Sequence, residues 1–156
     1  MKAWMLAALA ALVLAGCDDS TGPDWSEFAD GATAAEARWR ASGPLHYVLV
    51  QERDCACQAE ERGPVRIEVT RNGATETVVS MTYVDDNVPV PSEYRQLFLP
   101  VTGLFELIRE AARAEVAALQ VTYGSVLGYP SRIQINWVAE VAEDDVVYSV
   151  TALQPL

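Results

Sequence analysis

The feature that most constrains the fold is a hairpin pattern near the middle of the chain. Residues 65–70 alternate between apolar and polar side chains, with Val65, Ile67 and Val69 on one face. Asn72-Gly73 follows, and both residue types tolerate the positive φ angles of a tight hairpin turn. Residues 74–83 then have the composition of a return strand. Strands joined in this way form an antiparallel sheet with one buried face.

Further helices and strands extend this hairpin into a complete domain. Gly43-Pro44 ends a first helix, which starts at residue 34 or as early as Trp25 and Phe28, and Thr102 is the expected N-cap of a second helix. We expect helices over residues 34–42 and 103–115, a proline-containing loop over 85–100, and further strands over 45–53, 119–123, 131–139 and 146–153. The order α-β-β-β-α-β-β-β predicts an α+β fold, in which two helices cover one face of an antiparallel sheet of about six strands.

The two halves of this pattern resemble each other. Residues 64–69 are similar to residues 130–135, and residues 78–82 roughly match residues 146–151. Internal duplication would explain the similarity, but amphipathic hairpins also resemble each other without common origin. In a duplicated chain, residues 54–63 would be an insertion at a loop tip, which is a frequent place for function.

The first 16 residues are built as an export signal. Met1-Lys2 is a short positive end, residues 3–14 form an apolar run, and the small residues Ala15 and Gly16 precede Cys17. The apolar run is shorter than the ~20 residues that span a bilayer. The sequence Leu14-Ala15-Gly16-Cys17 resembles the bacterial lipobox, which implies cleavage before Cys17 and a covalent lipid on its thiol.

This resemblance predicts a lipoprotein of the cell envelope. Residues 1–16 are the predicted signal peptide, residues 17–32 the lipidated cysteine and an acidic tether, and residues 33–156 a single domain. The domain is expected in the periplasm or outside the cell, and the choice between inner and outer membrane stays open. Two or more acyl chains give stable anchoring where one does not, because each buried methylene contributes ~0.8 kcal/mol.

The charge balance excludes some partners. Once Lys2 leaves with the signal, ten arginines and 22 acidic residues remain, a net charge of −12. Such a surface argues against nucleic acid, whose affinity depends on Lys and Arg, and against lying flat on anionic lipid. It suits a basic partner, although acidity is also a common means of solubility.

Cys55 and Cys57 remain as a pair once Cys17 carries lipid, and a disulfide is expected in an oxidising compartment. In an extended chain their Cα atoms would lie ~6.5–7 Å apart, near the upper limit for a disulfide, so a turn is required. Thiol-redox chemistry and binding of a soft ion such as Cu(I) are the alternatives. Only one histidine, His46, is present as a further soft-metal ligand.

No catalytic pattern is found. Ser125 is misplaced for a nucleophile elbow, and the predicted mature chain has no lysine. Asp85-Asp86 and Asp144-Asp145 are typical of solvated turns or of weak calcium sites. We therefore expect a non-enzymatic protein without cofactor or resident metal.

Several scattered elements together resemble an uncharacterised family of bacterial lipoproteins and secreted proteins. Arg132, Gln134 and Asn136 share one face of a predicted strand, although family members often have aspartate at the position of Asn136. The resemblance covers roughly residues 39–153 and rests on Trp39, Tyr47, Cys55-Ala56-Cys57, Leu104-Phe105, Tyr123-Gly124, residues 128–136 and Asp144-Asp145. It implies a fold and a location, and it carries no activity.

The sequence thus predicts a membrane-anchored binding domain that contacts an envelope protein through a sheet edge or the cysteine loop. The alternative is a periplasmic thiol-redox or copper-binding protein that uses Cys55 and Cys57. The candidate binding residues are Asp54, Cys55, Cys57, Tyr129 and Pro130.

Overall fold

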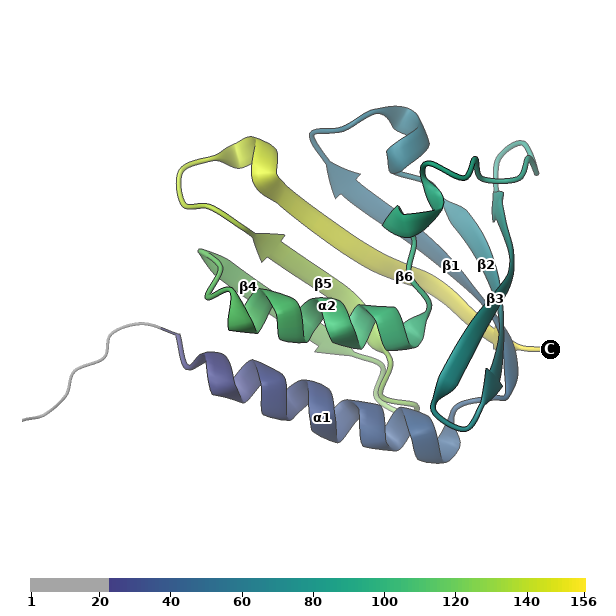
Figure 1. The fold of residues 1–156 in the computed structure, drawn as a ribbon, viewed down its shortest axis with the longest axis horizontal. Coiled ribbons are helices and arrows are strands. Elements are labelled where there is room, and N and C mark those ends of the chain that lie inside the picture. Colours follow the sequence, from purple (N-terminus) through teal and green to yellow (C-terminus); the bar gives the residue numbers. More distant parts are fainter. Residues whose placement is uncertain (1–22) are drawn as a thin grey trace, which may run out of the picture.

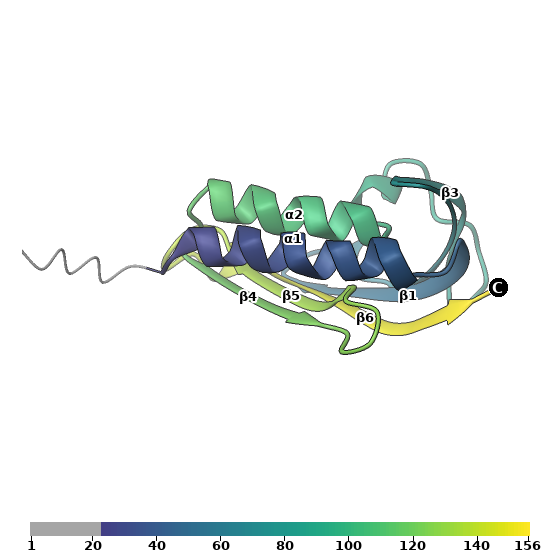
Figure 2. The ribbon, with the colours of Figure 1, turned by 90° about the horizontal axis from the view of Figure 1, so that it is seen from below.

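A computed structural model describes residues 23–156, so the predicted signal peptide and Cys17 lie outside the described residues. Its six strands form one antiparallel sheet in the order β3-β2-β1-β6-β5-β4, and both helices lie on the same face (Figures 1 and 2). The predicted α+β fold and element order are confirmed. The elements are α1 (Trp25–Ser42), β1 (His46–Cys55), β2 (Val65–Asn72), β3 (Thr75–Tyr83), α2 (Val101–Arg113), β4 (Ala118–Tyr123), β5 (Pro130–Asn136) and β6 (Asp145–Pro155), with 3-10 turns at Ala59–Glu61, Arg95–Leu97 and Ala142–Asp144.

The first helix is longer than the expected residues 34–42. The Asp24 carboxylate caps it by accepting a hydrogen bond from the backbone N–H of Ser26 at 3.0 Å. Residues 25–32, assigned above to the tether, are therefore helical, and Ala32 is fully buried. The described part of the domain begins with α1 at Trp25.

The strand order excludes internal duplication. In a duplicated chain, β1, β2 and β3 would be equivalent to β4, β5 and β6. The order of the strands across the sheet agrees with this, because β3-β2-β1 is followed by β6-β5-β4. However, β1 and β6 are antiparallel, so β3 points opposite to its counterpart β6. Superposing the halves would require turning one of them over, which would place one helix on the other face. Both helices share a face, so the halves are not equivalent units (Figure 2).

The β2–β3 turn lies one residue later than predicted. Asn72 pairs with Thr75, which leaves Gly73 and Ala74 as the two turn residues. Only Gly73 has a positive φ, of 62°. A type II′ turn needs positive φ at its first central residue alone, so glycine there suffices and Asn72 stays in the strand.

Trp39 is the centre of the core and is fully buried. Its indole meets Tyr47 of β1 edge-on at 5.2 Å and Tyr129 edge-on at 6.3 Å between ring centroids. A Cβ on Gly43 would lie 2.7 Å from the indole ring, so the chain leaves α1 through a glycine. The helix, the central strand and the β4–β5 loop therefore converge on one side chain.

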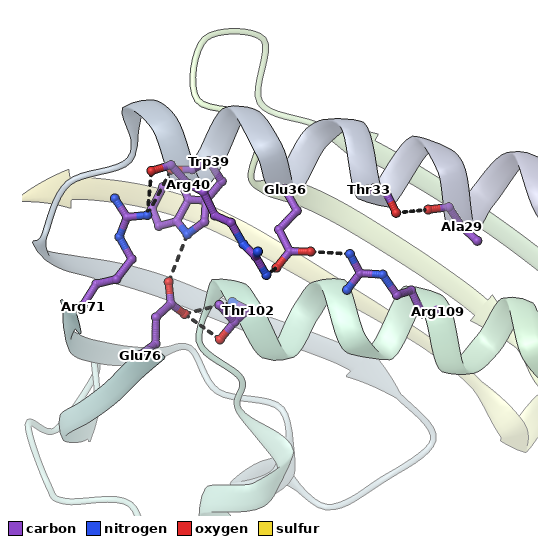
Figure 3. A network of polar contacts seen from close by, with 9 residues as sticks. All are labelled: Ala29, Thr33, Glu36, Trp39, Arg40, Arg71, Glu76, Thr102 and Arg109. Carbon is purple, nitrogen blue, oxygen red and sulfur yellow. Dashed lines mark hydrogen bonds and ion pairs between the residues drawn. The ribbon is translucent and has the colours of Figure 1, made fainter. Parts of the chain in front are cut away.

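The β2–β3 hairpin caps both helices with opposite charges. Arg71 and Glu76 are register partners. Arg71 donates to the carbonyls of Trp39 at 3.3 Å and Arg40 at 3.2 Å, at the C-terminus of α1 (Figure 3). It also donates to the carbonyl of Gly43, the C-cap of α1. A cation here complements the negative end of the helix dipole.

Glu76 caps the N-terminus of α2. Its Oε2 accepts hydrogen bonds from the backbone N–H and the hydroxyl of Thr102, both at 2.9 Å, and its Oε1 accepts one from the Trp39 indole N–H at 3.0 Å (Figure 3). Pro100 is the N-cap of α2 and has no side-chain cap bond, so the prediction of Thr102 as N-cap was wrong. The carboxylate of Glu76 in β3 replaces it. Burial, together with this charge, raises the pKa of Tyr47.

Glu36 joins the two helices. It pairs with Arg40 at 2.6 Å on α1 and with Arg109 on α2, and its side chain is only 10% exposed. Burial by itself would raise the pKa of Glu36, but hydrogen bonds from Arg109 and Arg40 outweigh it. The pKa of Glu36 therefore lies below its ordinary value of 4.5.

Replacing Glu76 by alanine is expected to lower the free energy of unfolding by about 2–4 kcal/mol, because the Trp39 and Thr102 N–H groups would lose a charged acceptor. Urea unfolding followed by tryptophan fluorescence measures the loss. Glu106→Ala, at an exposed position of α2, is the control. Equal losses in the two variants would contradict the capping role.

The ion pairs of Glu36 predict that the free energy of unfolding falls in acid. Its folded pKa is depressed, so its stabilisation is complete above the ordinary value of 4.5 and is lost as the pH falls through the folded pKa. Glu36→Gln should be less stable than the native chain at neutral pH, and the difference should shrink as the pH falls from about 5 to about 3. A difference that does not change over this range would exclude the ion pairs as its source.

Candidate functional site: a polar hollow beside the cysteine loop

Cys55 and Cys57 are joined by a disulfide, with their Cα atoms 5.3 Å apart. Cys55 is the last residue of β1, and Cys57 lies in the bend that follows. The Cα separation is shorter than an extended chain allows, as the requirement for a turn predicted. The disulfide therefore closes the end of β1 into a small, partly exposed ring.

Other contacts hold the cysteine loop, residues 54–63, in place. Arg62 donates twice to the Cys57 carbonyl, at 3.0 and 2.6 Å. Arg53 donates from its backbone to the Arg62 carbonyl and from its guanidinium to the Glu61 carbonyl, both at 2.7 Å. The same guanidinium lies 5.2 Å from the centre of the Tyr148 ring, a cation–π contact. The shape of the loop thus depends on two arginines as well as on the disulfide.

A polar hollow lies beside this loop on the sheet face that the helices leave open. The end of β1, the middle of β5 and the start of β6 meet there, because Val147 of β6 is paired with Asp54 on one side and Gln134 on the other. We call this the polar hollow. It is lined by Asp54, Cys55, Ala56, Arg132, Gln134, Asp145 and Val147.

Two buried oxygen atoms at the polar hollow have no hydrogen-bond donor within residues 23–156. Asn136 pairs with Asp145 in the strand register at its border. Asn136 Oδ1 and Asp145 Oδ1 are buried, and neither accepts a hydrogen bond from a described residue. Buried polar atoms are normally paired, and a donor at this position would satisfy both oxygens. A donor-rich cationic group, guanidinium or ammonium, meets that need best.

The surroundings of the polar hollow are mostly acidic. Glu52 and Asp54 are exposed at the end of β1, and Glu143 and Asp144 are exposed in the turn before β6. Arg132 is the one cation of the lining, and it donates to Ser149 Oγ at 3.4 Å. In the part of the chain that the structure describes, no group of three or more His, Cys, Asp or Glu side chains is placed to hold a metal ion.

Tyr129 and Pro130 lie apart from the cysteine residues, so the structure does not bring the predicted binding residues Asp54, Cys55, Cys57, Tyr129 and Pro130 together in one loop. Cys55 lies level with Val146 and Ile135, whereas Pro130 is five residues away at the other end of β5. At ~3.3 Å per residue, this places them ~16 Å apart along the strand. The two loops lie at opposite ends of the sheet (Figure 1).

Gly128 and Tyr129 instead dock the β4–β5 loop on α1. Gly128 has a φ of 80°, and a Cβ there would lie 2.6 Å from the Ala35 carbonyl. Tyr129 packs on Trp39, and a Cβ on Gly124 would lie 2.8 Å from the Tyr129 ring. This motif therefore has a packing role in the fold.

Other residues considered from the sequence also lie outside the polar hollow. His46 Nε2 is 2.9 Å from Glu68 Oε1 near the other end of β1. Asp86 accepts a hydrogen bond from the Val88 N–H at 3.2 Å, as a turn residue does. The sequence predicted that Arg132, Gln134 and Asn136 share a face. The sequence did not show that β6 lies between β5 and β1. This strand order brings Asp54 close to the three residues of β5.

The chain is similar to the members of a known protein family. Residues 31–155 match a family of unknown function (DUF6174). The chain belongs to this family. No curated protein and no solved structure matches it. Within residues 23–156, the two helices are not long and apolar enough to cross a membrane.

Replacing both Cys55 and Cys57 by serine should cost only about 1–2 kcal/mol of unfolding free energy, because the closed loop is very short and gains little from restricting the unfolded chain. Urea unfolding of the two proteins measures the difference. The variant Arg53→Ala, which removes the contacts to Glu61 and Tyr148, is the comparison and should cost at least as much. Global unfolding of the double serine variant would contradict this assignment.

Proposed function

We propose that this protein is a lipid-anchored, non-enzymatic binding domain of the bacterial cell envelope. Its polar hollow binds a cationic segment of an envelope protein. The observation that carries the binding half of the proposal is the buried, unpaired Asp145 Oδ1 in the lining of the polar hollow, with the unpaired Asn136 Oδ1 on the residue that is paired with Asp145. An arginine or lysine side chain supplies both the donors and the opposite charge that they lack.

The lipid anchor is supported by the lipobox-like sequence that ends at Cys17. The polar residues 18–24 separate this cysteine from the first residue of α1. Seven residues span at most ~25 Å when fully extended. Such a tether keeps the domain close to the bilayer, while the acidic surface gives it no affinity for anionic lipid.

Expressed in a bacterium with its signal intact, the protein should carry a diacylglyceryl group on Cys17 and fractionate with membranes. Mass spectrometry of the detergent-extracted protein identifies the modification. Cys17→Ala should remove both the lipid and the membrane association and leave the fold unchanged. Equal membrane association of this variant would contradict anchoring through Cys17.

The polar hollow is tested with a defined cationic probe, a blocked tetra-arginine peptide. Asp54→Asn combined with Asp145→Asn should weaken its binding about tenfold, measured by NMR titration at low salt. The matched control is Glu27→Gln combined with Asp30→Asn, which removes the same charge from an exposed face of α1. Equal weakening in both double variants would mean that only net charge attracts the peptide, and would contradict a site at the polar hollow.

The alternative function uses the disulfide at the rim of the polar hollow. A thiol-redox protein would exchange its Cys55–Cys57 bond with glutathione, and a copper protein would bind Cu(I) after reduction. Thiol counting and mass spectrometry of the purified domain, with and without reductant, separate these outcomes. A pair that neither exchanges nor takes up copper leaves the binding function as the better account.

A further inference from the structure

The second half of β6 has a neighbouring strand on one side only. β6 pairs with β1 as far as Pro155, but its pairing with β5 stops at Arg132 and Ser149. If that register continued, Pro130 would face Thr151, and proline has no N–H to donate. Residues 150–154 therefore present an unpaired backbone edge in the middle of the sheet.

The β4–β5 loop bends away from this edge because it is docked on α1. Gly128 lies against the Ala35 carbonyl and Tyr129 against Trp39, which turns the chain before β5 toward the helix. The loop closes on itself through bonds from the Gly128 N–H to the Gly124 carbonyl and from the Gly124 N–H to the Tyr129 carbonyl, both 2.8 Å. It therefore holds its shape without pairing to β6.

An open hollow remains between the loop and the free edge. Its lining is mainly apolar, and Val126 is 81% exposed there. The lining residues are Gly124, Ser125, Val126, Leu127, Tyr129 and Leu153. We call this hollow and the edge formed by residues 150–154 the edge groove.

The edge groove is neutral in a strongly charged protein. The chain has 11 basic and 22 acidic residues, yet residues 116–131 and 146–156 contain none of them. Natural sheets usually protect a free edge with charges, prolines or a covering segment. The end of the outer edge of β3, residues 81–83, is covered in this way, since Val90 donates to the Met81 carbonyl at 3.0 Å and Tyr83 to the Val88 carbonyl at 2.9 Å. Residues 150–154 contain no charge and no proline.

We propose that the edge groove binds an extended, uncharged segment of a partner protein by strand addition. The backbone of that segment pairs with residues 150–154, and its alternate apolar side chains contact Leu153, Leu127 and Val126. Backbone pairing supplies affinity, and the hollow selects the side chains. A charged segment is excluded because it would bury an unpaired charge against apolar walls.

The position of the edge groove suits a membrane-anchored domain. It lies at the end of the sheet near the C-terminus, whereas the chain enters α1 from the opposite end (Figure 1). This inference rests on the proposed function only in treating the domain as a binding module. It uses other residues than the polar hollow, and a partner can occupy both.

The test uses a blocked eight-residue peptide of alternating threonine and valine, added to the soluble domain with residues 150–154 followed by NMR. We expect amide shifts at these residues and at Leu127. Two further peptides carry N-methyl groups on the valine or on the threonine amides. One of the two should lose binding, because all donors of one residue type point to the same edge of a strand. Its identity gives the direction of the added strand.

Val126→Asp should weaken the peptide about tenfold by placing a carboxylate in the apolar hollow. Val138→Asp, at another apolar position that is 51% exposed, should not. No shift at about 1 mM peptide, shifts confined to residues 118–123 of the β4 edge, or equal binding by both methylated peptides would overturn the proposal. The Asp54→Asn and Asp145→Asn changes should leave this binding intact, so its failure and failure of the polar hollow are distinguishable.

Discussion

Burial of the Trp39 indole is the constraint on which the rest of the structure depends. The ring packs edge-on against Tyr47 and Tyr129, and Arg71 lies 5.5 Å from its centre. Its N–H is a donor that burial would leave unsatisfied, and Glu76 accepts from it. A single side chain thereby fixes α1 against the sheet, sets the position of the hairpin that carries Arg71 and Glu76, and holds the β4–β5 loop beneath the helix.

The same arrangement leaves the other face of the sheet and its edges free for binding. The helix face is filled by apolar side chains and by the hydrogen bonds and ion pairs of Arg71, Glu76 and Glu36. The open face receives the alternate residues of the strands, which include Arg132, Gln134 and Asp145. The polar hollow lies over the paired ends of β1 and β6, whereas the edge groove lies where the pairing of β5 with β6 stops. Tyr129 connects the edge groove to the buried network, because its ring packs on Trp39.

Sequence reasoning recovered what is local and missed what depends on neighbours. The alternation of Val65, Ile67 and Val69 predicted a strand with one buried face, and element order followed from such patterns. Thr102 was wrongly predicted as a cap, because the carboxylate that serves α2 comes from β3, 26 residues earlier. Asp54 and Cys55 were predicted to lie in a loop, but β1 continues to Cys55. Tyr129 and Pro130 were grouped with them because they were also predicted to lie in a turn, and only the strand register shows that they are at the other end of the sheet.

The central position of β6 has a consequence for the biogenesis of the protein. β6 is the last element of the domain to be synthesised, yet it joins the three strands β1 to β3 to the two strands β4 and β5, because β1 and β5 are its neighbours. Until it arrives, no strand joins β1 to β3 with β4 and β5, so the sheet stays in two pieces. A chain that follows the proposed export route must be threaded through a translocon unfolded, and this topology delays the fold until its final strand has been delivered.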